Sequence, residues 1–189
     1  MRVSKTQAQE NRKRVVETAS VLFRERGFEG IGVIELMAAA GLTHGGFYNQ
    51  FRSKSALMAE ATACGFSHMR TSADVVDFIN FYLSRRHRDA LGKGCAIAAL
   101  SGDAARQQGD VKSSFEAGIG QLVENLTAML PADTHAEGRA KAMSLVAQAV
   151  GAIVLSRACR EEAPLTDEIL ETCRIALLEQ YSPETHVSR

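Results

Sequence analysis

The segment from Val33 to Phe51 constrains the fold more than any other part of the chain. Val33 to Ala40 has the composition of a short helix, and Gly41 is the residue type that best adopts the left-handed conformation of a helix C-terminus. After a tight turn, Thr43 is placed to cap a second short helix that runs to about Gln50. The spacing therefore predicts a helix, a tight turn and a second helix.

Two glycines, Gly45 and Gly46, lie inside this second short helix, where each costs about 1 kcal/mol relative to alanine. A benefit other than helix stability must favour them. A helix in the major groove gains from having no side chain where its backbone meets DNA, and its N-terminal amides help to bind phosphate. The glycines therefore point to a contact with DNA.

The side chains of this second helix divide into two faces. Four-residue spacing predicts that its two phenylalanines point into a small core, whereas its other side chains face outward. The expected core residues are Leu22, Phe23, Leu36, Phe47 and Phe51, and the outward residues are His44, Tyr48 and Asn49.

Helices are expected on both sides of this segment. Residues 12–26 carry an amphipathic stripe that Gly27 ends, with Thr6 and Gln9 as a candidate capping box. Ser53 can cap a longer helix that follows.

A set of matching positions runs through residues 10–60: Ala19, Leu22, Phe23, Gly27, Phe28, Leu36, Ala40, Gly41, Leu42, Thr43, Gly46, Phe47, Tyr48, Phe51, Ser53, Lys54 and Leu57. This set resembles the N-terminal DNA-binding domain of the TetR family of transcriptional regulators (TetR/AcrR type). The likeness is specific because it extends over many positions rather than one short motif.

The resemblance implies a helix-turn-helix at about residues 32–51. Thr43, His44 and Gly45 would lie near base edges, with Tyr48 and Lys54 on phosphates. His44 and Asn49 could read bases or simply reach the sugar-phosphate backbone. The complete set of DNA-binding candidates is Thr43, His44, Gly45, Gly46, Tyr48, Asn49, Gln50, Arg52 and Lys54. The alternative is a three-helix packing unit without a DNA contact.

Two departures from the family pattern affect these candidates. The chain has Gly30-Ile31-Gly32 where the family often has a capping Thr or Ser, so a hydroxyl contact to phosphate is in doubt there. Gln50 replaces a frequent His, which leaves its contact uncertain.

Composition favours an all-α protein with almost no sheet, since the chain has three prolines, no tryptophan and many helix-forming residues. Further helices are expected at about 73–85, 95–106, 110–130, 134–160 and 166–181, the last capped by Thr166. We expect a DNA-binding domain at 1–60 and a larger helical ligand-binding and dimerisation domain at 61–189.

The zero net charge of the chain hides an asymmetry. Up to Met58 there are nine Lys and Arg against five Asp and Glu, a balance of +4, and the remainder carries −4. This suits an N-terminal module that approaches a polyanion such as double-stranded DNA.

The family resemblance also implies that the C-terminal part binds a small-molecule effector and forms a homodimer. Candidate effector residues are Phe78, Tyr82, Phe115 and Ile119, for which plain core packing is the alternative. Cys95 is a candidate redox or electrophile sensor, because it precedes a predicted helix and lies near Arg88 and Lys93 in sequence. The signal therefore stays open between an apolar ligand and chemistry at Cys95.

Small residues at helical spacing predict the dimer interface. They lie at Ala140, Ser144, Ala147 and Gly151, and the following helix would add Cys173 and Leu177 to a four-helix bundle across a two-fold axis. Packing within one chain is the alternative.

Several classes of function are disfavoured. The four cysteines form no C-x-x-C pair, and no apolar signal segment or membrane-length apolar run is present, which predicts a reduced, cytoplasmic protein. Cys64 and His68 have a spacing that metal ligands use, but no further ligand is apparent, so no metal or cofactor is expected. No enzyme motif is visible. The sequence favours a homodimeric repressor; an activator or an interaction protein without DNA binding is the alternative.

Overall fold

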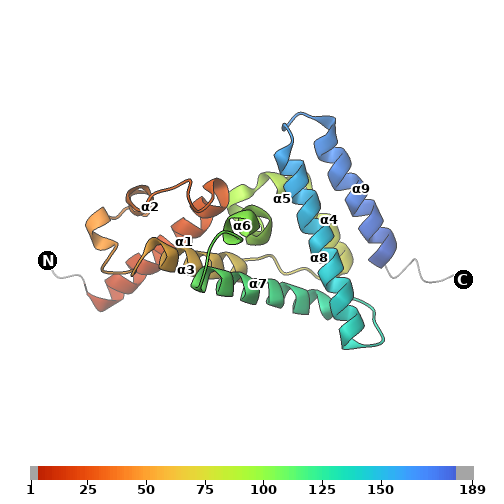
Figure 1. The fold of residues 1–189 in the computed structure, drawn as a ribbon, viewed down its shortest axis with the longest axis horizontal. Helices are drawn as coiled ribbons and strands as arrows, with labels where there is room; N and C mark the ends of the chain where they lie inside the picture. The colour runs from red at the N-terminus through yellow and green to blue at the C-terminus, as the bar shows by residue number, and fades with distance from the viewer. Residues whose placement is uncertain (1–3, 182–189) are drawn as a thin grey trace, which may run out of the picture. The chain divides into compact units, whose positions relative to one another are not determined.

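The computed structural model describes residues 4–181, which contain nine α-helices, two short 3-10 helices and no β-strand (Figure 1). The chain forms two compact units. The first comprises the residues up to Met69 together with Leu91–Gly118, and the second comprises Arg70–Ala90 together with the residues from Ile119 onward. The all-α class is confirmed, and residues 91–118 pack with the N-terminal helices.

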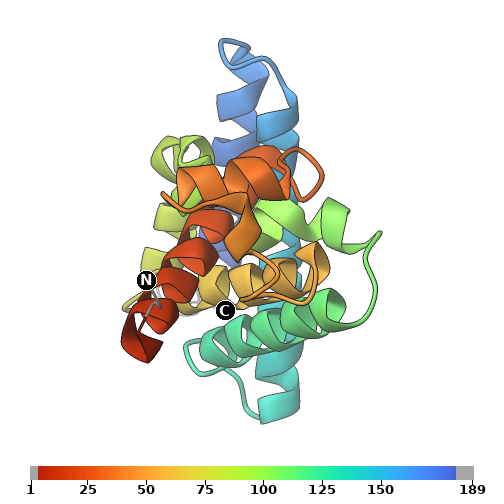
Figure 2. The same cartoon turned by 90° about the vertical axis from the view of Figure 1, so that its left-hand side faces the viewer.

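The first unit is built around two long helices, α1 (Lys5–Arg26) and α3 (Lys54–Ser67), which pack against each other (Figure 2). It also contains α2 (Val33–Ala39), the 3-10 helices η1 (His44–Gly46) and η2 (Leu91–Lys93), α6 (Ala96–Ala104) and the first part of α7 (Asp110–Thr127). One apolar core joins them, with contributions that include Phe23, Phe28, Leu36, Phe47, Phe51, Leu57, Leu100 and Phe115. This core holds the segment between α2 and α3 in place.

The ends of α1 and α3 follow from capping side chains. Ser4 accepts a hydrogen bond from the Gln7 N–H at 3.1 Å, so α1 starts at Lys5 and the expected capping box at Thr6 was wrong. Gly27 ends α1 with a φ of 77°, as expected. The predicted cap at Ser53 is confirmed, because its Oγ accepts from the Ala56 N–H at 3.1 Å.

The second unit contains α4 (Val75–Tyr82), α5 (Arg85–Asp89), the rest of α7, α8 (His135–Ala158) and α9 (Pro164–Tyr181). Figure 1 shows α8 and α9 packed side by side. The helices expected at 95–106, 110–130, 134–160 and 166–181 lie within three residues of their predicted bounds. The helix expected at 73–85 ends at Tyr82, and Ser84 caps a separate short helix, α5, that was not predicted. The predicted cap at Thr166 was wrong: α9 begins at Pro164, and the Thr166 hydroxyl donates to the Ala163 carbonyl at 2.7 Å.

Among the described residues, α8 is the one helix long and apolar enough to cross a membrane by length and composition. This is weak evidence for a span, because the core helices of soluble proteins pass the same test. Only 39% of the most apolar window of α8 is buried inside the chain. Part of its apolar surface therefore lies uncovered.

Candidate DNA-binding interface

The turn after α2 is fixed by Gly41, whose φ is 71°. The Gly41 N–H donates to the Ala38 carbonyl and the Leu42 N–H to the Met37 carbonyl, both at 2.9 Å. These bonds satisfy carbonyls at the end of α2 and turn the chain sharply. The predicted turn is thus present, for the predicted reason.

The expected second helix from Thr43 to Gln50 is shorter than predicted. His44–Gly46 form a single 3-10 turn, and Thr43 makes no side-chain cap among the described residues. The Phe47 N–H donates to the His44 carbonyl at 3.0 Å, and the Phe51 N–H to the Phe47 carbonyl at 2.9 Å. Two adjacent glycines lower helix propensity enough to leave consecutive turns instead of a regular α-helix. We refer to residues 43–51 as the recognition segment.

The side chains of the recognition segment point as expected. Phe47 and Phe51 are buried in the core, with ring centroids 5.4 Å apart. Tyr48 is 69% exposed, and His44 and Asn49 are exposed as well. The buried aromatic rings therefore anchor a segment whose other edge faces solvent.

The fold does not explain the two glycines of the recognition segment. A Cβ built on Gly45 meets no described atom within 4 Å, and one on Gly46 meets Met37 Cε at 3.7 Å, an ordinary contact. Neither residue has a positive φ. Alanine would therefore fit at both positions, and packing within the described chain does not require glycine at either.

The remaining predicted DNA-binding residues differ in their surroundings. Thr43 and Arg52 are exposed, whereas Gln50 is half-buried with its side-chain oxygen in the interior. Lys54 is the first residue of α3, and its Nζ lies 3.2 Å from Glu29 Oε2. Gln50 and Lys54 are thus less accessible than Thr43 and Arg52.

Arg12 stabilises the recognition segment in a way that the sequence did not reveal. Its guanidinium donates to both carboxylate oxygens of Glu60, at 2.5 and 2.6 Å, and lies 4.6 Å from the centroid of the Phe51 ring. The hydrogen bonds to Glu60 raise the pKa of Arg12. This contact ties α1 to α3 and covers the end of the recognition segment.

Asp103 of α6 makes a second contact between residues that are far apart in the sequence. Its Oδ2 accepts a hydrogen bond from the backbone N–H of Phe28 at 2.9 Å. Phe28 belongs to residues 27–32, which connect α1 to α2. The segment after η2 therefore helps to shape the DNA-binding unit itself.

Arg24 forms a buried polar link within the same unit. Its Nε and one Nη donate to the Gly92 carbonyl at 2.9 and 2.6 Å, and the other Nη donates to Ser20 Oγ at 2.8 Å. Burial lowers the pKa of Arg24, and charge interactions with Cys64 and Cys95 oppose that effect. Arg24 thus joins α1 to η2 near two cysteines.

The predicted effector and sensor residues lie in different units. Cys95 is buried at the N-cap of α6, and Phe115 packs its ring against Phe66 in the first unit, at a centroid distance of 5.6 Å. Phe78 and Tyr82 pack together in the second unit at 5.1 Å, and Ile119 is 36% exposed. The described contacts do not bring these five residues to a single cavity.

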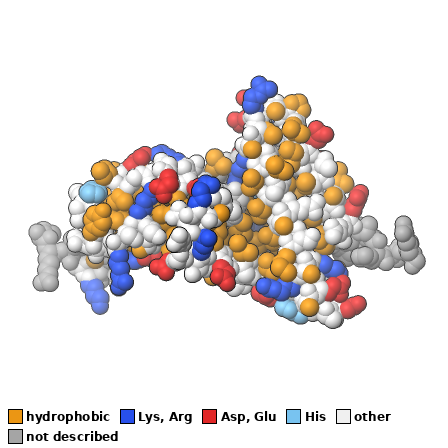
Figure 3. Space-filling model, viewed as in Figure 1, with side chains coloured by type: hydrophobic (Ala, Val, Ile, Leu, Met, Phe, Trp, Pro, Cys, Tyr) orange, Lys and Arg blue, Asp and Glu red, His pale blue; other side chains and the backbone are white. Residues whose placement is uncertain are grey.

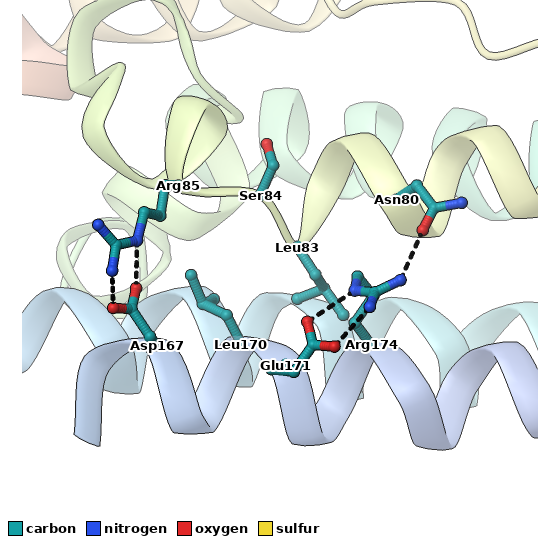
Figure 4. Close-up of a pocket in the computed structure, with 8 residues that line it drawn as sticks. All are labelled: Asn80, Leu83, Ser84, Arg85, Asp167, Leu170, Glu171 and Arg174. Atoms are coloured by element: carbon teal, nitrogen blue, oxygen red, sulfur yellow. Dashed lines mark hydrogen bonds and ion pairs between the residues drawn. The ribbon is translucent and has the colours of Figure 1, made fainter. Parts of the chain in front are cut away.

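The second unit contains a groove of about 550 Å³ that the sequence did not indicate (Figure 4). It is lined by Asn80, Leu83 and Ser84, by Arg85 of α5, and by Asp167, Leu170, Glu171 and Arg174 of α9. Arg85 pairs with Asp167, with Nε to Oδ1 at 2.6 Å, while Arg174 pairs with Glu171 and donates to Asn80 at 3.1 Å. The Arg85–Asp167 ion pair joins α5 to α9, and the Arg174–Asn80 hydrogen bond joins α4 to α9. Helix packing therefore accounts for these side chains as well as a ligand would.

The predicted dimer residues share one face of α8. Ala140, Ser144 and Ala147 are exposed and Gly151 is half-buried, while nearby Leu155 is 60% exposed. Figure 3 shows hydrophobic side chains gathered over α8. On α9, Cys173 is half-buried, but Leu177 is fully buried within the chain and available only for internal packing.

Cys64 and His68 lie together, with Sγ 3.6 Å from Nδ1. Burial raises the pKa of the Cys64 thiol, partly offset by a hydrogen bond with Ser20 and the charge of Arg24. The described residues contain no group of three potential His, Cys, Asp or Glu metal ligands.

Comparisons with known proteins agree with this geometry. Residues 15–61 match the family model described as bacterial regulatory proteins, tetR family. The chain is 31% identical over 99 residues to the HTH-type transcriptional repressor DhaR of Mycobacterium sp. (strain GP1), which is 48% of this chain and 50% of DhaR. It is 37% identical over 59 residues to the HTH-type transcriptional regulator AcrR of Shigella flexneri, covering 31% of this chain and 27% of AcrR. The matches thus span half or less of these curated relatives.

Solved structures extend the likeness to most of the chain. The reduced form of NemR from E. coli matches with a TM-score of 0.75 at 21% identity, over 92% of this chain and 97% of NemR. A TetR transcriptional regulator from Chloroflexus aurantiacus J-10-FL matches with a TM-score of 0.73 at 21% identity, over 93% of this chain and 96% of that chain. At these identities the likeness establishes the fold, a helix-turn-helix domain followed by a larger helical domain.

Proposed function

We propose that the chain is a cytoplasmic transcriptional repressor of the TetR family with no catalytic role, because residues 15–61 match the family model and 99 residues are 31% identical to the repressor DhaR. It binds an operator in double-stranded DNA as a homodimer and leaves the operator when a small molecule or a redox or electrophile signal acts on it. The observation that carries the DNA-binding proposal is the recognition segment, which exposes Tyr48 and Asn49 beside a glycine that the fold does not require.

The two edges of the recognition segment have separate tasks in this proposal. Gly45 allows the backbone to approach the base edges, and His44 and Asn49 reach bases or the sugar-phosphate backbone beside it. The Tyr48 hydroxyl, Arg52 and Lys54 donate to phosphates and set the register of the protein on the duplex. Phe47 and Phe51 keep this arrangement rigid from inside the core.

The homodimer is supported by the uncovered face of α8. A helix that is apolar beyond its buried side needs a further partner, and small residues at Ala140, Ser144 and Ala147 allow close approach of another helix. A second copy of α8, with α9 beside it, provides that partner in a symmetric four-helix bundle. Dimerisation also presents two recognition segments to successive turns of DNA.

The signal is proposed to act by population shift, favouring a dimer whose recognition segments do not fit successive grooves. Two entry points are open. One is an apolar effector bound near Phe78 and Tyr82, which are buried in the second unit. The other is modification of Cys95, which lies at the start of α6 in the same unit as the recognition segment.

Operator binding is tested with DNA from the promoter region beside the gene of the protein. Specific binding should persist against unrelated competitor DNA and weaken steeply as salt rises, because phosphate contacts release counterions. Tyr48→Ala and Lys54→Ala should each weaken binding, while Glu116→Gln, an exposed change on α7, should not. If both variants bind as the wild type does, the DNA-binding assignment fails.

Dimerisation is tested by sedimentation analysis of Leu155→Glu, which places a charge on the exposed face of α8. The variant should be monomeric with unchanged helix content, and it should lose operator affinity. Glu168→Gln, an exposed change near the start of α9, is the control. A dimeric Leu155→Glu would show that the subunits associate elsewhere.

A further inference from the structure

Lys54 occupies a position that favours a nearby anion. It is the first residue of α3, whose first turn contains no acidic side chain. The N-terminus of a helix carries partial positive charge, so a lysine there adds to an already positive site. In a DNA complex this site would hold a phosphate, which is the role proposed above for Lys54.

In the free protein a carboxylate takes that place. Glu29 Oε2 lies 3.2 Å from Lys54 Nζ, although the two residues are 25 positions apart in the chain. Glu29 is one of residues 27–32, between α1 and α2. No other carboxylate is paired with Lys54 among the described ion pairs.

The loop that carries Glu29 is anchored on both sides of that residue. Phe28 and Ile31 are both buried, and the Phe28 N–H is held by Asp103. A Cβ on Gly30 would lie 1.9 Å from the Arg26 carbonyl oxygen, so the loop packs tightly against the end of α1. The backbone of Glu29 is therefore held between two anchored residues.

The fold has little need of this ion pair. The Glu29 side chain is 78% exposed and that of Lys54 is 26% exposed, and pairs with one well-hydrated partner contribute little to stability. A carboxylate paired with the Lys54 ammonium, however, must be displaced when a DNA phosphate binds there. The pair should therefore matter more for binding than for folding.

We propose that Glu29 competes with DNA phosphate for Lys54 and so limits the affinity of the protein for the DNA backbone. This rests on the proposed operator binding. A phosphate must displace the Glu29 carboxylate before Lys54 can bind it. This penalty applies to every duplex alike, because a phosphate contact carries no sequence information.

The test is the affinity of the full chain with Glu29→Gln for a random-sequence duplex and for the promoter DNA, measured by fluorescence anisotropy at several salt concentrations. Both affinities should rise roughly two- to fivefold, which is the range expected for one exposed charge interaction. The slope of log K against log salt should steepen by less than about 0.9, the value for a whole phosphate contact, because Lys54 contacts phosphate in both complexes. Glu116→Gln removes an equal charge from the same unit and should change neither quantity.

A double-mutant cycle with Lys54→Gln separates competition from a general charge effect. If Glu29 acts through Lys54, Glu29→Gln should no longer tighten binding in the Lys54→Gln background. An equal gain in that background would overturn the inference, as would unchanged affinity of Glu29→Gln when circular dichroism shows an intact fold. Wild-type protein that binds neither duplex would overturn the operator proposal itself, and this inference with it.

Discussion

Replacing Gly45 by alanine should raise the stability of the fold and at the same time weaken the contact with DNA. A Cβ built at this position meets no described atom within 4 Å, so the methyl group fits the free protein without strain. Alanine also reduces the conformational entropy of the unfolded chain, which should stabilise the protein by about 0.4–1 kcal/mol. For a chain of this size the corresponding rise in Tm is about 1–4 °C.

The same methyl group should weaken operator binding, because it occupies the space through which the backbone approaches the groove. Inserting a methyl group into a close-packed contact costs about 1–3 kcal/mol, which is roughly a 5- to 150-fold rise in Kd. Fluorescence anisotropy at fixed salt gives Kd, and a thermal melt gives Tm.

Gly102→Ala is the matched control for this experiment. Gly102 is an exposed glycine in α6 of the same unit, and its Cβ also meets no described atom within 4 Å. Gly102→Ala should raise Tm without changing Kd. The reasoning is refuted if Gly45→Ala binds the operator as tightly as the wild type, or if it lowers Tm while Gly102→Ala raises it.

Three further predictions follow from individual contacts. Gly32 is the N-cap of α2, it makes no side-chain cap, and a Cβ built there meets open space. Gly32→Ser should therefore stabilise α2 by a few tenths of a kcal/mol and tighten operator binding, and a lower Tm or weaker binding would contradict this. Asp103→Ala removes the acceptor of the Phe28 N–H and should lower the free energy of unfolding in urea by about 1–3 kcal/mol. Asp103→Asn keeps an acceptor oxygen and should lower this free energy less, so equal decreases in the two variants would argue against the hydrogen bond. Burial lowers the pKa of His87 below its ordinary value of 6.5, so the unfolded chain binds the proton more readily. The contribution of the neutral, buried His87 to the free energy of unfolding is therefore fully present above pH 6.5 and is lost as the pH falls below that value. Urea unfolding should show a smaller free energy at pH 5.5 than at pH 7.5 in the wild type, and a smaller difference in His87→Gln.

Features set by neighbouring residues could be predicted from the sequence. Gly27 and Gly41 end their helices because left-handed backbone at a helix C-terminus is a local requirement that glycine meets best. Phe47 and Phe51 point inward together because four-residue spacing places them on one side of a helical turn. The helix predicted from Thr43 to Gln50 was too long for a local reason as well. The spacing of Phe47 and Phe51 suggested a regular helix, but Gly45 and Gly46 have low helix propensity and leave only short turns.

Contacts between distant residues could not be predicted in this way. Arg12 and Glu60 are 48 positions apart, and Phe28 and Asp103 are 75 apart, so no spacing rule connects them. Each of these charged side chains looked like an ordinary surface residue in the sequence. The partner of each charged side chain depends on how the helices pack, and the whole apolar core determines that packing.

The return of residues 91–118 to the N-terminal helices limits how this protein could exchange its C-terminal part during evolution. Recombination that joined residues 1–60 to an unrelated sensor would strip the Phe28 N–H of its Asp103 partner and expose core surface that Leu100 and Phe115 now cover. A transplant would work only if the new sensor brought its own counterpart of α6. Helix α6 and the loop after α1 should therefore be inherited together, although two separate stretches of the gene encode them.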